Sequence, residues 1–133
     1  MRIVLDTNVL VAALLNPGRV PDRAIAAACA AGATMLTDAR IGLEYREVLA
    51  RPKLRRIDPA LAAALLAALD ARGEVLDAVP AWEGAMIDGD DRAFVEVALA
   101  GAAHAVVTGN AKHYPTNLGF EVLSPAELLA RIG

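Results

Sequence analysis

Short apolar runs alternate with helix-like segments along the chain, and this alternation constrains the fold more than any other feature of the sequence. The strand-like runs cover residues 2–5, 34–37, 74–79, 105–108 and 120–123. Strands that alternate with helices are typical of βαβ units, in which helices cover both faces of a parallel sheet. The sequence therefore predicts an α/β fold whose central strands are buried on both faces.

The length of 133 residues suits a single domain over residues 1–133. Its linkers rich in Gly and Pro, residues 16–21, 79–89 and 109–119, are too short to divide it. With 56% hydrophobic but only 4% aromatic residues, the core is expected to be aliphatic. No apolar run approaches the roughly 20 residues of a membrane span. We therefore expect a soluble, cytoplasmic protein, in which the lone Cys29 cannot form an internal disulfide.

Several helix ends carry recognisable signals. Asp58 and Pro59 supply an N-cap and a first helical proline, and Ser124 and Glu127 form a capping box. These signals and the apolar spacing predict helices near residues 6–15, 22–31, 39–51, 59–72, 91–100 and 125–132.

The first strand ends abruptly in a polar segment, Asp6-Thr7-Asn8. Ligands of open parallel sheets bind at the carboxyl ends of the strands, near the point where the strand order reverses. Asp6 is therefore a candidate site residue. The alternative is an ordinary helix N-cap, since Asp, Thr and Asn all favour that position.

Two further carboxylates lie on predicted helices. Glu44 borders the apolar face of its helix and needs a partner, which could equally be an arginine. Asp91 lies on the same side of its helix as Phe94, whereas Glu96 is expected on the opposite side. Because Asp88 or Asp90 can cap that helix, Asp91 is free for another role.

The strand at 105–108 runs into Gly109-Asn110, which brings Asn110 to the same sheet edge as Asp6, unless it simply forms a Gly-Asn turn. Thr108 and His113 lie close to this edge. His104 precedes the strand, so we expect it at the far end of the sheet in a structural role.

Together these segments would bring three carboxylates and one amide to a single edge. Two bare carboxylates about 4 Å apart repel by about 4 kcal/mol at an effective dielectric near 20. Such a cluster requires protonation or a cation. Oxygen ligands without His or Cys pairs favour Mg²⁺ or Mn²⁺ over zinc.

Basic residues are concentrated in one stretch, although the net charge of −3 is unfavourable for a nucleic-acid-binding protein. The stretch holds five of the thirteen basic residues, Arg46, Arg51, Lys53, Arg55 and Arg56. It could contact phosphates, or it could be a solvated helix end whose cations favour the C-terminal dipole.

Four segments of the chain resemble PIN-domain ribonucleases, in particular bacterial toxins of the VapC type. These segments are IVLDTNVLV, EYREVLARPK, DDRAFVEVALAGAAHAVVTGN and the trailing KHY. The resemblance extends over essentially the whole chain. It implies a three-layer α/β/α fold with a parallel sheet of about five strands. It also implies metal-dependent cleavage of RNA, and a homodimer or higher homo-oligomer that a cognate antitoxin protein neutralises.

By this resemblance, Asp6, Glu44 and Asp91 match the metal-binding acids. Asn110 stands where many relatives have Asp, which leaves three anionic groups, enough for one Mg²⁺ or Mn²⁺. The resemblance thus implies an endoribonuclease in which the ion activates an attacking water, which Asp91 or Glu44 could orient and Asn110 could hydrogen-bond. Thr108 and His113 would assist, and the basic stretch would contact RNA or the antitoxin.

Two other functions stay open. A non-catalytic PIN-like module could bind RNA or a protein through the same surface. A phosphatase could use Asp6 as a covalent nucleophile, but such enzymes show Asp-x-Asp after the first strand, and here the third residue is Asn8.

Overall fold

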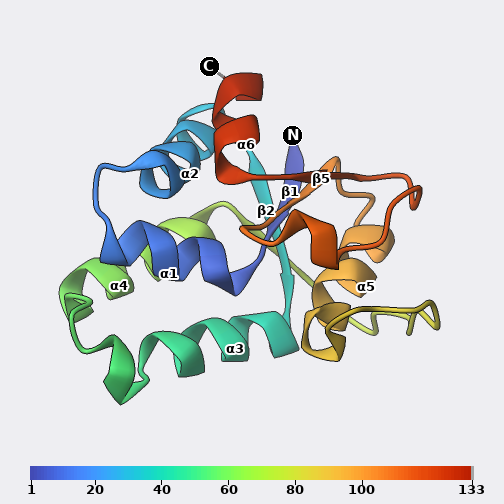
Figure 1. Ribbon diagram of the computed structural model, residues 1–133, viewed down its shortest axis with the longest axis horizontal. Helices are drawn as coiled ribbons and strands as arrows, with labels where there is room; N and C mark the ends of the chain where they lie inside the picture. Colours follow the sequence, from blue (N-terminus) through green and yellow to red (C-terminus); the bar gives the residue numbers. More distant parts are fainter. Residues whose placement is uncertain (133) are drawn as a thin grey trace.

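A computed structural model describes residues 1–132, which form an α/β fold around five parallel strands (Figure 1). The sheet order is β3-β2-β1-β4-β5. The chain therefore builds outwards from β1 to β3 and then returns to β4 on the other side of β1. The order reverses between β1 and β4, and their carboxyl ends flank the place where this class of sheet binds ligands. The strands are β1 (Arg2–Leu5), β2 (Thr34–Asp38), β3 (Gly73–Leu76), β4 (Ala105–Val107) and β5 (Glu121–Leu123).

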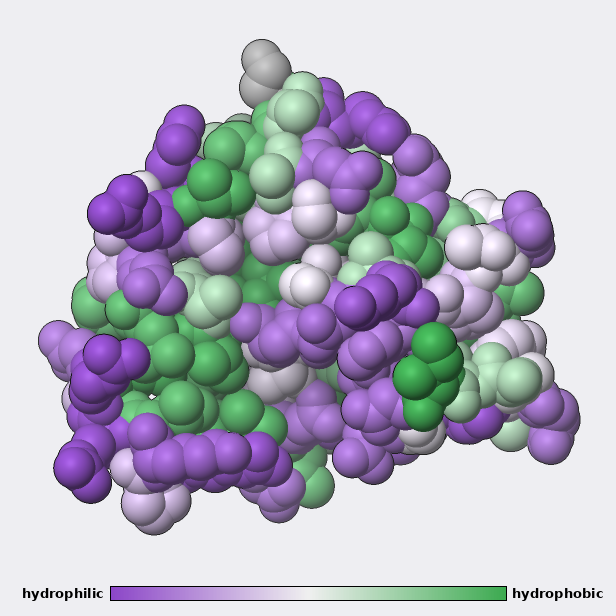
Figure 2. Space-filling view, in the orientation of Figure 1, coloured by the Kyte–Doolittle hydropathy of each residue, from purple (hydrophilic) through white to green (hydrophobic). Residues whose placement is uncertain are grey.

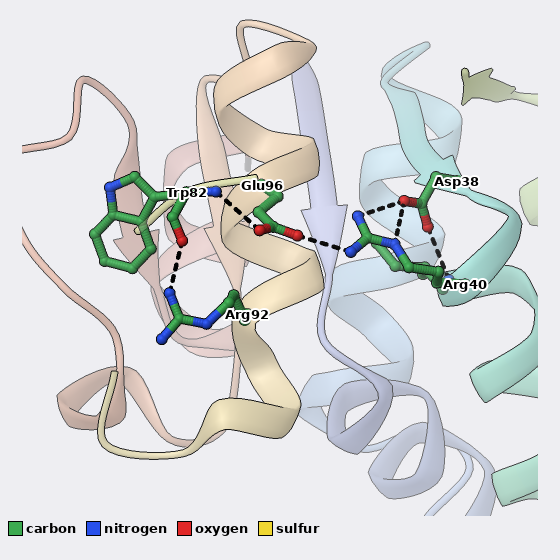
Figure 3. A network of polar contacts seen from close by, with 6 residues as sticks. Asp38, Arg40, Trp82, Arg92 and Glu96 are labelled. Atoms are coloured by element: carbon green, nitrogen blue, oxygen red, sulfur yellow. Dashed lines mark hydrogen bonds and ion pairs between the residues drawn. The ribbon is translucent and has the colours of Figure 1, made fainter. Parts of the chain in front are cut away.

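Helices cover both faces of the sheet, so the predicted three-layer architecture is confirmed. Helix α5 packs against β1, β2 and β4, whereas α1 packs against α2, and α2 against α6. Figure 3 shows α5 and the α1–α2 pair on opposite sides of β1. The helices are α1 (Thr7–Leu15), α2 (Val20–Ala30), α3 (Ala39–Leu49), α4 (Pro59–Ala71), α5 (Arg92–Ala100) and α6 (Pro125–Ile132). Single 3-10 turns are η1 (Pro52–Leu54), η2 (Gly89–Asp91) and η3 (Ala111–His113).

The core is aliphatic, as the composition predicts. Ile3 and Val4 of β1 and Val106 and Val107 of β4 have no exposed surface, because the two central strands are covered on both faces. The buried aromatic side chains of the core are Phe94, Tyr45 and Tyr114, and Phe94 of α5 is the most deeply buried of them. No helix among residues 1–132 combines the length and the apolar character needed to cross a membrane.

Local signals place most boundaries correctly. The capping box at the start of α6 forms, since Ser124 Oγ accepts from Glu127 N at 3.1 Å and Ser124 N donates to Glu127 Oε1 at 2.9 Å. The prediction for residues 74–79 is wrong at its end. Strand β3 stops at Leu76, and Ala78 adopts a left-handed conformation with φ 51°, which no extended strand tolerates.

Candidate functional site

The Asp6 carboxylate lies at the carboxyl end of β1 and is only 4% exposed. Its Oδ1 accepts from Asn8 N at 3.2 Å, so Asp6 does cap helix α1 as the sequence allowed. Its Oδ2 accepts from Thr108 Oγ1 at 2.9 Å and from the Tyr114 hydroxyl at 2.8 Å. These partners reach Asp6 because β1 and β4 pair in parallel, with Leu5 opposite Val107.

The number of donors around Asp6 defines what else this carboxylate can bind. A carboxylate offers about four lone-pair positions, and Thr108, Tyr114 and Asn8 occupy three of them. The remaining position is on Oδ1. Asp6 is thus held rigidly and keeps one lone pair for a further donor or a cation.

Thr108 links Asp6 to the amides at the end of β4. It is fully buried, and its hydroxyl oxygen accepts from Asn110 N at 3.0 Å and from Asn8 Nδ2 at 3.4 Å. Asn8 Oδ1 in turn accepts from Gly109 N at 3.0 Å. The Asn110 side chain is exposed and makes no capping hydrogen bond to η3.

Glu44 on α3 is half-buried beside the start of α1. Its Oε2 accepts a short hydrogen bond from Thr7 Oγ1, so its partner is a hydroxyl and not the arginine that the sequence left open. The next residue, Tyr45, is buried and donates to the Leu5 carbonyl oxygen at 2.6 Å. These two contacts fix α3 against the carboxyl end of β1.

Asp91 occupies the N-cap position of α5, yet its side chain makes no capping hydrogen bond. Asp88 caps the preceding 3-10 turn instead, by accepting from Asp90 N at 2.9 Å. Partial burial, and then the negative charges of Asp6, Asp88, Glu44 and Asp90, raise the pKa of Asp91 to about 7. An aspartate in this state gains from any cation that comes within reach.

The same charges act on two buried tyrosines. Burial, followed by the charges of Asp6 and Glu44, raises the pKa of Tyr45, and burial followed by Asp6 and Asp91 raises that of Tyr114. Asp6, Glu44 and Asp91 therefore share one electrostatic neighbourhood, although they come from three separate segments. Their oxygen donors and excess negative charge fit a hard divalent cation. Within residues 1–132, however, no three His, Cys, Asp or Glu side chains already stand as a complete metal-ligand set.

Beside this neighbourhood lies an ion-pair network that the sequence analysis missed (Figure 3). Arg40 bridges Asp38 and Glu96, with its Nη2 2.7 Å from Asp38 Oδ2 and its Nη1 2.7 Å from Glu96 Oε1. The prediction that Glu96 faces away from the apolar side is wrong, because Glu96 is 5% exposed. Burial alone would raise the pKa of Glu96, but hydrogen bonds from Arg40 and from Trp82 N outweigh it and lower the pKa.

The network also holds the segment that leads to Asp91. Trp82 N donates to Glu96 Oε2 at 2.9 Å, and Arg92 Nη1 donates to the carbonyl oxygens of Trp82 and Gly84 at 2.7 and 2.8 Å. The Arg92 guanidinium lies 5.5 Å from the centre of the Trp82 ring, within cation–π distance. One signal was available in the sequence. Asp38 comes directly after the strand expected at residues 34–37, as Asp6 comes directly after the first strand.

The two histidines differ as the sequence suggested. His104 lies at the amino end of β4, where its Nδ1 accepts from Arg2 N at 2.9 Å, so its role is structural. His113 is half-buried in η3, one residue before Tyr114.

The basic stretch lies apart from the carboxylates. All five residues are exposed, at the end of α3 and around η1. Three of them line an apolar groove of about 480 Å³ between this segment and α4, namely Arg46, Arg51 and Arg55. None of Asp6, Glu44 and Asp91 lines that groove.

Comparison with known proteins adds two findings. A family model described as the PIN domain matches residues 2–112, a span that includes Asp6, Glu44, Asp91 and Asn110. One chain of the crystal structure of VapBC2 from Rickettsia felis, bound to a DNA fragment from its promoter, superposes with a TM-score of 0.59. The identity is 17%, over 93% of this chain and 98% of that one, which shows a common fold. No curated protein matches the sequence.

Proposed function

Because the chain belongs to the PIN domain family, we propose that it is a Mg²⁺- or Mn²⁺-dependent endoribonuclease and the toxin of a VapC-type toxin–antitoxin pair. One observation carries this proposal above the others. Burial, and then the surrounding charges of Asp6, Asp88, Glu44 and Asp90, raise the pKa of Asp91 to about 7. A bound divalent cation would relieve the repulsion.

In this proposal Asp6, Glu44 and Asp91 hold the cation, directly or through water. When bound, the cation would stabilise charge on a phosphate oxygen and lower the pKa of an attacking water. Two of the donor side chains differ in how they are held. Asp6 is fixed by Thr108, Tyr114 and its own helix, whereas the Asp91 carboxylate makes no capping bond.

The remaining residues of the site act through hydrogen bonds. Thr108 and Tyr114 donate to Asp6 and keep its carboxylate in one orientation. Asp91 or Glu44 would accept the proton of the attacking water. Asn110 is neutral, so it would position a water or a substrate group without adding charge to the cluster. His113, half-buried beside Tyr114, would assist at the substrate side.

The proposed partners are RNA and an antitoxin protein, and the chain would form a homodimer or a larger homo-oligomer. The structural neighbour from Rickettsia felis is a VapBC2 assembly bound to DNA, which supports an antitoxin partner. The groove between η1 and α4 offers apolar walls beneath Arg46, Arg51 and Arg55, and Lys53 and Arg56 lie in the same exposed stretch. This surface suits RNA phosphates or an acidic part of an antitoxin.

A non-catalytic RNA- or protein-binding module is the second candidate function. Two observations favour it: residue 110 is Asn and not a fourth acid, and residues 1–132 contain no complete ligand set. Calorimetric titration with Mn²⁺ separates the two functions. The nuclease should bind Mn²⁺ and gain about 2.7 kcal/mol of stability at a hundredfold excess over the dissociation constant, whereas the module should not respond at millimolar Mn²⁺.

RNA cleavage is the direct test. Purified protein should cut RNA when Mg²⁺ or Mn²⁺ is present and stop when EDTA is added. Asp6→Asn and Asp91→Asn should abolish cleavage while circular dichroism shows a folded protein. Glu47→Gln, which changes an exposed acid of the same helix as Glu44, is the matched control and should cut like the parent. If the two Asn variants cut at the parental rate, the proposed site is wrong.

A further inference from the structure

A second hollow lies beside the segment after β4, close to the point where Thr108 hydrogen-bonds Asp6. We call it the side pocket. It has a volume of about 420 Å³ and lies between α1, the start of α2, the start of α6 and the segment after β4. Figure 2 shows it as a depression with an apolar floor near the middle of the face. Its walls include Val20, Pro21 and Pro125, and its polar lining includes Asn8, Gly109 and Asn110.

The side pocket is connected to Asp6 through two hydrogen bonds. Asn110 N donates to Thr108 Oγ1 at 3.0 Å, and Thr108 Oγ1 donates to Asp6 Oδ2 at 2.9 Å. The Gly109–Asn8 hydrogen bond fixes the other polar wall to the start of α1. In the proposed nuclease, the nucleotide next to a cation-bound phosphate would lie at the mouth of this pocket.

The lining is uncharged. No Asp, Glu, Lys, Arg or His contributes to it, so the pocket cannot neutralise a phosphate or pair with an acidic peptide. Apolar walls and a few fixed polar groups are the usual lining of a small-molecule pocket, and a volume above about 300 Å³ is usual as well. A nucleobase has this character, because its faces are apolar and its edge carries hydrogen-bond donors and acceptors.

The two amides differ in what they still offer. Asn8 accepts from Gly109 N and donates one Nδ2 proton to Thr108, so it keeps one proton for a ligand. Asn110 makes no capping bond, and its amide can both donate and accept. An aspartate at this position, when ionised, could only accept. The neutral Asn110 can therefore form complementary hydrogen bonds with the edge of a base. Its presence also means that the carboxylate cluster lacks a fourth negative charge.

We propose that the side pocket holds one unstacked base of the RNA substrate, next to the scissile phosphate, and that Asn110 reads the edge of that base. This inference rests on the proposed nuclease function. It requires a single-stranded segment, because bases in an RNA helix are stacked and paired. The enzyme would thus select its cleavage site in a loop or tail by one neighbouring base.

The first test uses cleavage of oligonucleotides in which each position around the cut is varied in turn. The parent should prefer one base at one flanking position by about tenfold, the discrimination that a bidentate amide–base contact provides. Asn110→Ala is compared with the parent by the ratio of its cleavage rates for different bases, so that a lower overall rate does not count, and this ratio should fall to one at the selected position and persist at other positions. Ala126→Trp, which fills the pocket at an exposed residue of α6, should have the same effect. Ala130→Trp, on the same helix but outside the pocket lining, is the matched control.

The second test measures binding without cleavage. Asp91→Asn protein should bind a single-stranded RNA about tenfold less tightly when an abasic nucleotide stands at the selected position, as measured by fluorescence anisotropy. Adding Ala126→Trp should abolish the difference, and adding Ala130→Trp should preserve it. If the parent cleaves RNA but shows no flanking-base preference, or Ala126→Trp keeps it, the inference is wrong and the nuclease function stands. If the parent neither cuts nor binds RNA, both proposals fail together.

Discussion

The protonation of Asp91 leads to an unusual prediction, namely that removing this functional carboxylate stabilises the metal-free protein. Burial and four neighbouring carboxylates raise the pKa of Asp91 from 3.8 to about 7. The folded state holds the Asp91 proton more tightly than the unfolded state does. The contribution of this proton to the free energy of unfolding is therefore complete below pH about 4 and is lost as the pH rises through about 7. Metal-free protein should therefore be less stable at pH 8 than at pH 5.

The size of this effect follows from the pKa. A rise from 3.8 to about 7 corresponds to about 4 kcal/mol for a fully buried group. Asp91 is only partly buried, so solvent screening should reduce the effect to about 1–2 kcal/mol. Asp91→Asn removes the ionisable group and should raise the free energy of unfolding by that amount at pH 8, with a much smaller gain at pH 4.

Urea denaturation in EDTA between pH 4 and pH 8 provides the measurement. The difference between Asp91→Asn and the parent should grow with pH, and it should reverse in saturating Mn²⁺, which stabilises the parent selectively. Glu47→Gln provides the control for removing an exposed acid from the surface. Parallel pH profiles for parent and Asp91→Asn would refute the electrostatic coupling on which the site depends.

Three further predictions test other parts of the structure. Glu96→Ala should lower the free energy of unfolding by about 2–3 kcal/mol, since Arg40 and Trp82 N lose a buried acceptor, and urea denaturation should show a smaller loss for Glu96→Gln. Phe94→Ala should cost about 3–5 kcal/mol in the same assay because the ring is 1% exposed in the core, and a loss near zero would contradict its placement. Burial and the site carboxylates raise the pKa of both Tyr45 and Tyr114. An ultraviolet absorbance titration should therefore show no phenolate before the protein unfolds. A tyrosine that titrates at pH about 10 in the folded protein would contradict this environment.

What the sequence predicts well is governed by neighbours along the chain. The residues RIVL form β1 with the expected bounds, since an apolar run followed by Asp, Thr and Asn has few other interpretations. The Ser124 capping box depends on residues three positions apart and forms as expected. Asp91 makes no capping bond, as helix periodicity predicts, but it occupies the N-cap position of α5 itself, and Asp88 caps the preceding 3-10 turn and not α5.

What the sequence does not reveal depends on partners far away. Helix periodicity alone turns Glu96 towards solvent, but Arg40, 56 positions earlier, and Trp82 of a separate loop together bury it. Tyr114 gives no local sign that its hydroxyl reaches Asp6 across 108 positions. The apolar side pocket has the same origin, because α1, α2 and α6 meet only in the tertiary structure.

The position of β1 in the middle of the sheet determines when, during synthesis, the site around Asp6 can form. The first strand is synthesised well before its second neighbour, β4, which begins only at Ala105. Thr108 and Tyr114, which orient Asp6, are synthesised 102 and 108 positions after it. A nascent polypeptide therefore cannot complete this centre before Tyr114 has been synthesised and β4 has paired with β1, and any activity that depends on the orientation of Asp6 cannot begin earlier.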